Sequence, residues 1–192
     1  MVDSPVLEKF SRAVLRGLAE GKAVEVDGLG TFYPDPAAGF RFAPHTQPTI
    51  FIAYGAEDQA AVASLYQVFE RAGFSPWMDC KKLLPGQNWA RALEAAIETS
   101  DFFVPCFSSR SVDKRGGFQA EIRYALDCAR RVPLEEIYLV PVRLDACRVP
   151  RSVQREWQYI DLFPDWAGGV ARLVAAIRTE WQQRRDRRFM AR

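Results

Sequence analysis

Short apolar runs alternate with amphipathic segments along the chain from residue 49 onward. Thr49–Tyr54 and Phe102–Phe107 have the length of a strand and carry no charge, as expected for strands buried on both faces. Between the apolar runs, apolar residues recur at spacings of three and four, which is typical of helices that pack on one face. This alternation predicts right-handed crossovers and a parallel sheet. The predicted fold class is therefore α/β, with a parallel sheet flanked by helices.

The same pattern gives approximate bounds for the other elements. Further strands are predicted at residues 74–78, 137–142 and 159–160. Helices are predicted near residues 62–69, 89–97 and 122–129, and a longer one runs from about residue 167 into the C-terminal tail. Asn88 is the expected N-cap of the second of these helices.

Residues 1–47 carry a different pattern. Ser4 and Pro5 predict the start of a helix, because proline loses no hydrogen bond at the first helical position. The helix is expected to end at Gly21, and the alternation that follows predicts a β-hairpin. We therefore expect a helix and β-hairpin appendage over residues 1–47, a main domain over residues 48–178 and a basic helical tail over residues 179–192.

Ligands of parallel sheets bind outside the carboxyl ends of the strands, so residues that follow a strand are candidate site residues. Tyr54 is followed by Gly55 and Ala56, whose small side chains let a ligand approach the backbone. Neither G-x-G-x-x-G nor a P-loop motif is present, which excludes those two phosphate-binding classes.

Two further loops carry polar residues. The loop after the second strand contains two lysines and Pro85-Gly86, and is typical of a lid or a docking surface. Ser108 follows the third strand, and Glu121 lies in the first turn or two of the next helix. Taken alone, such a glutamate is most often a surface carboxylate that complements the helix dipole.

Composition narrows the class of protein. The chain has 192 residues, 48% of them hydrophobic, and no apolar run has the length of a membrane span. The charged N-terminal segment lacks the apolar core of a signal peptide. Four cysteines without a C-x-x-C pair and a single histidine argue against a zinc site and for reduced thiols. These features predict a cytoplasmic protein.

The C-terminal tail is basic, with six arginines against two carboxylates over residues 178–192. Such a tail could contact nucleic acid or an acidic membrane. A solvated helix end, whose arginines complement the helix dipole, is the favoured interpretation.

Several short motifs, taken in chain order, resemble the Toll/interleukin-1 receptor (TIR) domain family in its bacterial form. The first strand ends in Phe-Ile-Ala-Tyr over residues 51–54, and Asp58 follows it. The segment from Gly73 to Trp89 is similar to the family's second strand and BB loop. Further matches are residues 103–108, 119–122, 141–145 and 161–163. The resemblance covers about two thirds of the chain and implies a flavodoxin-like TIR fold.

This resemblance implies an NAD+ nucleosidase or cyclase that cleaves the nicotinamide–ribose bond. The product would be ADP-ribose or a cyclic ADP-ribose isomer, a signal in bacterial defence against phage. NAD+ is then the substrate, and no cofactor is implied. Nicotinamide leaves without a general acid, so one carboxylate that stabilises an oxocarbenium-like transition state suffices. Glu121 has this implied catalytic role.

The resemblance also implies binding and contact residues. The implied NAD-binding residues are Tyr54, Gly55, Ala56, Trp77, Asp79, Leu83, Ser108 and Phe118; Asp79 alternatively orients the BB loop. The BB loop is also an expected contact between TIR domains in a homo-oligomer, through Lys81, Lys82, Leu84, Pro85, Gly86 and Trp89. A downstream effector that senses the product is a further implied partner.

Two departures from the family pattern keep a second function open. Gly117 stands where the family often has an aromatic residue four positions before the glutamate, with Phe118 adjacent as a candidate to replace it. Ala53 stands in place of the usual serine of the first strand. The alternative is a non-enzymatic TIR adaptor that acts through contacts between TIR domains.

Residues 18–32 are similar to the helix–hairpin core of HU-type bacterial DNA-binding proteins. The basic arm of that family is absent, and residues 1–47 hold five basic and six acidic side chains. A net charge of −1 is unsuited to phosphate contacts. We therefore interpret the appendage as a packing or oligomerisation element.

Overall fold

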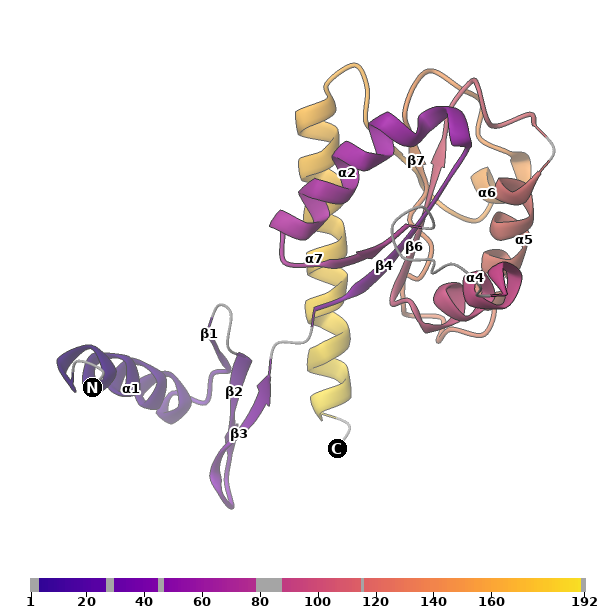
Figure 1. The fold of residues 1–192 in the computed structure, drawn as a ribbon. Helices are drawn as coiled ribbons and strands as arrows, with labels where there is room; N and C mark the ends of the chain where they lie inside the picture. Colours follow the sequence, from indigo (N-terminus) through magenta and orange to yellow (C-terminus); the bar gives the residue numbers. More distant parts are fainter. Residues whose placement is uncertain (1–3, 27–29, 45–46, 79–87, 115, 191–192) are drawn as a thin grey trace. The chain divides into compact units, whose positions relative to one another are not determined.

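The computed structural model describes residues 4–26, 30–44, 47–78, 88–114 and 116–190 (Figure 1). The chain folds as two compact units, residues 1–46 and residues 47–192. No helix in these ranges is both long and apolar enough to cross a membrane.

The smaller unit is a helix followed by a three-stranded antiparallel sheet. Its elements are α1 (Ser4–Ala19), β1 (Val24–Val26), β2 (Gly30–Asp35) and β3 (Gly39–Pro44), with the strands in the order β1-β2-β3. Asp35 holds the turn between β2 and β3, because its carboxylate accepts the N–H groups of Ala37 at 2.9 Å and Ala38 at 3.1 Å. Gly39, with φ of 83°, completes that turn in a conformation that favours glycine.

The larger unit contains a five-stranded sheet in the order β5-β4-β6-β7-β8, with every neighbouring pair parallel. This is the 2-1-3-4-5 order of a flavodoxin-like doubly wound fold, so the predicted fold class is confirmed. The strands are β4 (Thr49–Tyr54), β5 (Ser75–Trp77), β6 (Phe102–Phe107), β7 (Val142–Arg143) and β8 (Ile160–Asp161). The helical elements are η1 (Ala56–Asp58), α2 (Gln59–Arg71), α4 (Trp89–Thr99), α5 (Gly117–Ala129), α6 (Arg151–Gln154) and α7 (Trp166–Met190).

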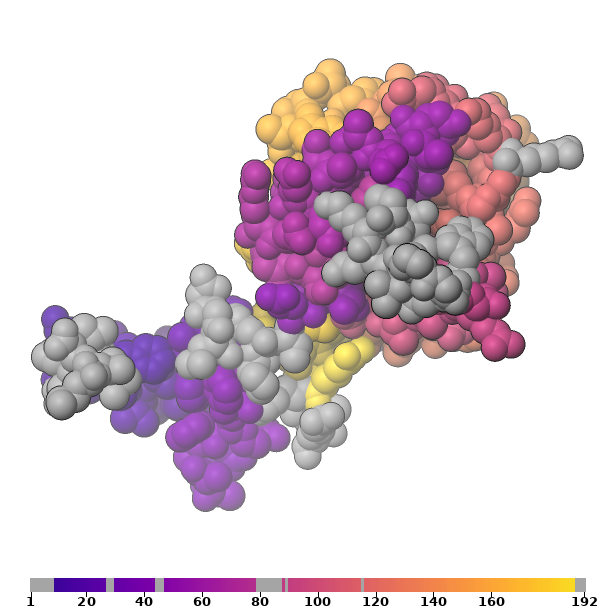
Figure 2. Space-filling view, viewed as in Figure 1, coloured from indigo at the N-terminus to yellow at the C-terminus, as the bar shows by residue number. Residues whose placement is uncertain are grey.

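Each face of this sheet is covered by its own layer of helices (Figure 1). Along β4, Ile50 and Ile52 pack with α2 and α7, whereas Phe51 and Ala53 pack with α4 and α5. Successive side chains of a strand point to opposite faces, so a strand covered on both sides must be apolar throughout. All six residues of β6 are buried for the same reason. In the space-filling view, α2 forms much of the visible surface of this unit (Figure 2).

Local sequence signals fix several helix ends. Asn88 caps α4 as predicted, because its side-chain oxygen accepts the N–H of Arg91 at 3.1 Å. Gly73, with φ of 80°, follows the end of α2 and lets the chain turn into β5.

The predicted strand over residues 137–142 is wrong in its extent. Pairing with β6 begins as an isolated bridge between Phe103 and Leu139, and β7 itself spans only Val142–Arg143. The ladder is interrupted between these points, because the β6 residue opposite the Val140 carbonyl is Pro105, which has no N–H to donate.

The expectation of a solvated C-terminal helix end is wrong at Arg184, which is 3% exposed. Its guanidinium donates to Glu180 Oε1 at 2.9 Å and to the carbonyl of Asp101 at 3.0 Å. It also donates to the carbonyl of Ile137. The basic tail therefore begins as part of the folded unit, because α7 reaches backbone carbonyls at the amino ends of the strands.

Candidate functional site

The centre of the sheet provides the crevice where ligands of doubly wound folds bind. Strand order reverses between β4 and β6, and the chain leaves these neighbouring strands at Tyr54 and Phe107. The loops that follow are therefore brought together at one edge of the sheet.

A buried polar network joins these two loops. The Asp58 carboxylate is 1% exposed and accepts the Ser108 hydroxyl at 2.5 Å. The Ser108 hydroxyl also lies 2.9 Å from that of Ser111. Arg110 donates to Asp58 Oδ1 at 2.9 Å, so the buried carboxylate has a cationic partner. A buried charge without such partners would be strongly destabilising, so this network fixes the geometry of the crevice.

Gly55 allows the two loops to approach closely. A Cβ atom at this position would lie 2.4 Å from Ser111 Cβ, which no relaxed structure tolerates. Lys114, which follows β6, donates to Glu57, which follows β4. This hydrogen bond lowers the pKa of the exposed Glu57 carboxyl. The loops after β4 and β6 are thus joined by side-chain contacts.

Aromatic side chains line the neighbouring face of the sheet, beneath α4 and α5. Trp77 stacks on Phe51 with ring centroids 4.6 Å apart and planes 16° apart. Phe107 and Phe118 meet edge to face at 5.7 Å. Trp77 is half-buried beside this cluster.

Glu121 lies in the second turn of α5 and is half-buried. Phe118, Ile122 and Ala125 form the buried face of the same helix. Tyr124, one turn beyond Glu121, donates to Glu98 of α4, so this flank of α5 faces α4. Glu121 is therefore placed at the side of the aromatic cluster, between helices, rather than on the outer surface.

The structure brings some of the predicted site residues together and separates others. Trp77, Phe118 and Glu121 belong to the layer of α4 and α5, whereas Tyr54 packs against the opposite layer. Ser108 and Gly55 are buried, and Ala56 is exposed. Because its hydroxyl is bonded to Asp58, Ser108 lies beneath the surface rather than lining it.

The remaining predicted residues cannot be placed. Asp79, Lys81, Lys82, Leu83, Leu84, Pro85 and Gly86 lie outside the described residues. Trp89 begins α4, but its side chain also lies outside the described part.

Sequence reasoning missed two features of this edge. The role of Asp58 as the buried centre of a network was not foreseen, although its position after an apolar strand was noted. A cavity between α5 and the loop before α6 was also missed, because its arginines come from distant segments. Arg148 and Arg151 flank Pro150, and that spacing was the only local signal.

Comparisons with known proteins support the fold. The family model for the TIR domain matches residues 50–174. The TIR domain of the Toll-related receptor TRR-2 from Hydra magnipapillata is 20% identical, with a TM-score of 0.52 over 66% of this chain and 97% of that one. A metazoan TIR-STING receptor from C. gigas is 23% identical, with a TM-score of 0.54 over 65% of this chain and 38% of that one. These identities establish similarity of fold alone.

A curated relative extends over nearly the whole chain. The uncharacterized protein y4cD of Sinorhizobium fredii is 23% identical over 184 residues, which are 94% of this chain. The chain spans only 28% of the length of that relative. The family model covers well over half of the 192 residues and includes every strand of the parallel sheet. The chain therefore belongs to the TIR domain family.

Proposed function

We propose that this TIR domain cleaves NAD+ at the nicotinamide–ribose bond, with Glu121 as the catalytic carboxylate. The placement of Glu121 carries the proposal: it is half-buried in the second turn of α5, in the same layer as the half-buried Trp77. A carboxylate in this setting is screened less by water than one on the open surface. It therefore stabilises the positive charge that develops on the ribose more effectively.

The remaining chemistry requires little of the protein. Nicotinamide carries its positive charge in the substrate and leaves as a neutral base, so no general acid is needed. Water attacking the ribose gives ADP-ribose, and attack by a nucleophile of the same molecule gives a cyclic isomer. We propose that this product acts as a signal in bacterial anti-phage defence, sensed by a downstream effector.

A second function, a non-enzymatic adaptor acting through TIR–TIR contacts, is favoured by Gly117. This residue begins α5 without a side chain, at the position where the family often places an aromatic ring. Phe118 is 9% exposed and packs against Phe107, so its ring serves the core and is not free to grip a substrate. If Trp77 cannot compensate, NAD+ binding is lost while the fold and its contact surfaces persist.

The deciding experiment is incubation of the purified protein with NAD+, followed by chromatographic separation of the products. The enzymatic proposal expects stoichiometric release of nicotinamide together with ADP-ribose or an isomer of it. Unchanged NAD+ at high protein concentration would favour the adaptor.

Assembly adds a further test of the enzymatic proposal. If the BB loop of one TIR domain completes the site of another, specific activity rises with protein concentration, because the competent species is an oligomer. Replacing Leu84 by Asp and Pro85 by Gly is then expected to lower activity most at low concentration. Specific activity that stays constant over a hundredfold range of enzyme would show that each monomer has a complete site.

A further inference from the structure

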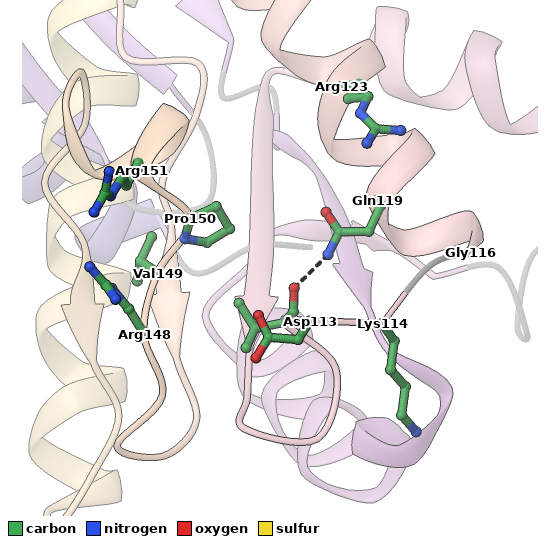
Figure 3. Close-up of a pocket in the computed structure, with 10 residues that line it drawn as sticks. Asp113, Lys114, Gly116, Gln119, Arg123, Arg148, Val149, Pro150 and Arg151 are labelled. Carbon is green, nitrogen blue, oxygen red and sulfur yellow. Dashed lines mark hydrogen bonds between the residues drawn. The ribbon is translucent and has the colours of Figure 1, made fainter.

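A cavity of about 840 Å³ lies on the side of α5 that carries Gln119 (Figure 3). The segment Val112–Lys114 and the start of α5 form one wall, and residues 148–151 form the other. Gln119 Nε2 donates to the carbonyl of Val112 at 2.8 Å, which ties the loop after β6 to α5. Three segments far apart in the sequence thus enclose one concave surface.

The charge of this cavity is strongly positive. Among the described residues, Lys114, Arg123, Arg148 and Arg151 line it, against one carboxylate, that of Asp113. Lys114 is paired with Glu57, whereas the guanidinium groups of the three arginines form no ion pair or hydrogen bond with any described residue. Arg148 and Arg151 lie on one wall and Arg123 on the other (Figure 3), and like charges that share one cavity with a single counter-charge repel one another. A bound anion would remove that repulsion.

The cavity is separate from the proposed NAD+ site. Gln119 and Arg123 are four residues apart and share one flank of α5. Glu121 lies two residues from each of them, a rotation of about 200° around the helix. The buried face of α5, with Phe118 and Ile122, separates this flank from the flank that faces α4.

We propose that this cavity is a binding site for a small molecule that carries two or more adjacent phosphate groups, such as a nucleoside diphosphate. Guanidinium groups bind phosphate oxygens in a bidentate manner, and several of them around one cavity match a diphosphate better than a single charge. The volume lies within the range of small-molecule sites. A nucleic acid would instead require a basic stripe that follows an extended backbone.

The test is titration of the full chain with inorganic pyrophosphate by calorimetry, in a buffer without phosphate. The double variant Arg148→Ala/Arg151→Ala is expected to bind at least tenfold more weakly, since each exposed charge contributes modestly. Asp113→Asn is expected to bind several-fold more tightly, because it removes the one carboxylate among the described residues that line the cavity. The matched control Arg71→Ala/Arg155→Ala removes two exposed arginines outside the cavity and is expected to bind like the parent.

Loss of fold would weaken binding in both the arginine variant and the aspartate variant. Opposite effects of the two variants therefore show that the charges of the cavity determine binding. In a labelled sample, the amide signals of Gly116, Gln119 and Val149 are expected to shift on titration. No binding at millimolar pyrophosphate, equal weakening in the control variant, or shifts confined to Tyr54 and Trp77 would overturn the proposal. Tighter binding of a short DNA duplex than of pyrophosphate, lost in the same arginine variant, would replace the small molecule by nucleic acid and also overturn it. None of these outcomes depends on whether the protein cleaves NAD+.

Discussion

Individual carboxylates in this domain have different roles because their surroundings differ. Glu121 is half-buried beside an aromatic layer, Asp58 is enclosed in a network, and Asp113 opens into a cationic cavity. The proposed role of Glu121 is catalysis, Asp58 stabilises the fold, and Asp113 lowers the positive charge of the cavity. A different effect of mutation is expected for each.

Replacing Glu121 by Gln keeps the size of the side chain and removes its charge. We expect NAD+ cleavage to fall a hundredfold or more, equivalent to about 3 kcal/mol of lost transition-state stabilisation. Glu70→Gln, an exposed change on α2, is the control and is expected to leave the rate unchanged. The measurement is nicotinamide release under saturating NAD+, with urea unfolding of both variants. A Glu121→Gln variant as active as the parent would reduce Glu121 to a surface carboxylate.

Replacing Asp58 by Ala leaves the buried Ser108 hydroxyl without its carboxylate acceptor and Arg110 without its counter-charge. We expect the free energy of unfolding to fall by about 2–4 kcal/mol. Asp127→Ala breaks the exposed pair with Arg130 and is expected to change stability by less than about 0.5 kcal/mol. Urea unfolding of the two variants provides the comparison, and equal stabilities would show that the network does not hold the loops.

At the scale of elements, the shortest strands depend most on side chains. β7 and β8 pair over only two residues each, and a bidentate ion pair crosses them. Arg143 donates to the Asp161 carboxylate at 2.6 Å and 2.7 Å, while its guanidinium lies 4.6 Å from the centre of the Tyr159 ring. A ladder of two residues contributes little to the stability of the pairing between β7 and β8. The Arg143–Asp161 ion pair therefore defines the position of β8.

The pair makes stability dependent on pH in a defined direction. The hydrogen bond from Arg143 lowers the pKa of Asp161 below its ordinary value of 3.8. The contribution is therefore present above pH 3.8 and is lost as the pH falls through the lowered folded-state pKa. Asp161→Asn is expected to be less stable at neutral pH and to lose less stability below pH 4. Parallel acid-unfolding curves for parent and variant would contradict this.

Periodicity predicted the strands and helices that carry long apolar runs, and failed where tertiary context decides. β4, β6 and α4 were predictable because burial on one or both faces imposes a pattern on the sequence. The extent of β7 was overestimated because Pro105 of β6 has no N–H to donate to the Val140 carbonyl, which breaks the ladder inside an apolar run. Glu121 and Trp77 lie in the helix and the strand that the sequence predicts for them, and their roles stay predictions. The partners of Ser108 and the arginines of the cavity were not predictable, because they depend on how loops distant in sequence meet in space.

At the scale of the whole molecule, the two units differ greatly in their capacity to fold alone. Every residue of both hydrophobic core clusters comes from residues 47–192. In the smaller unit, the hydrophobic side chains that are buried are Val14, Leu18 and Tyr33, counted over its described residues. Chains of about 40 residues rarely bury enough apolar surface to fold without a further constraint.

Removing residues 1–46 is therefore expected to leave residues 47–192 folded, with a free energy of unfolding within about 1 kcal/mol of the full chain, because both described core clusters lie within residues 47–192. The peptide of residues 1–46 alone is expected to lack cooperative thermal unfolding, since three buried side chains cannot offset its conformational entropy. Circular dichroism melting of the two fragments and of the full chain measures both.

Loss of cooperative unfolding in residues 47–192 would mean that the smaller unit stabilises the larger one. Cooperative, concentration-dependent melting of the peptide would instead mean that its exposed Phe40 and Phe42 are covered by a second copy.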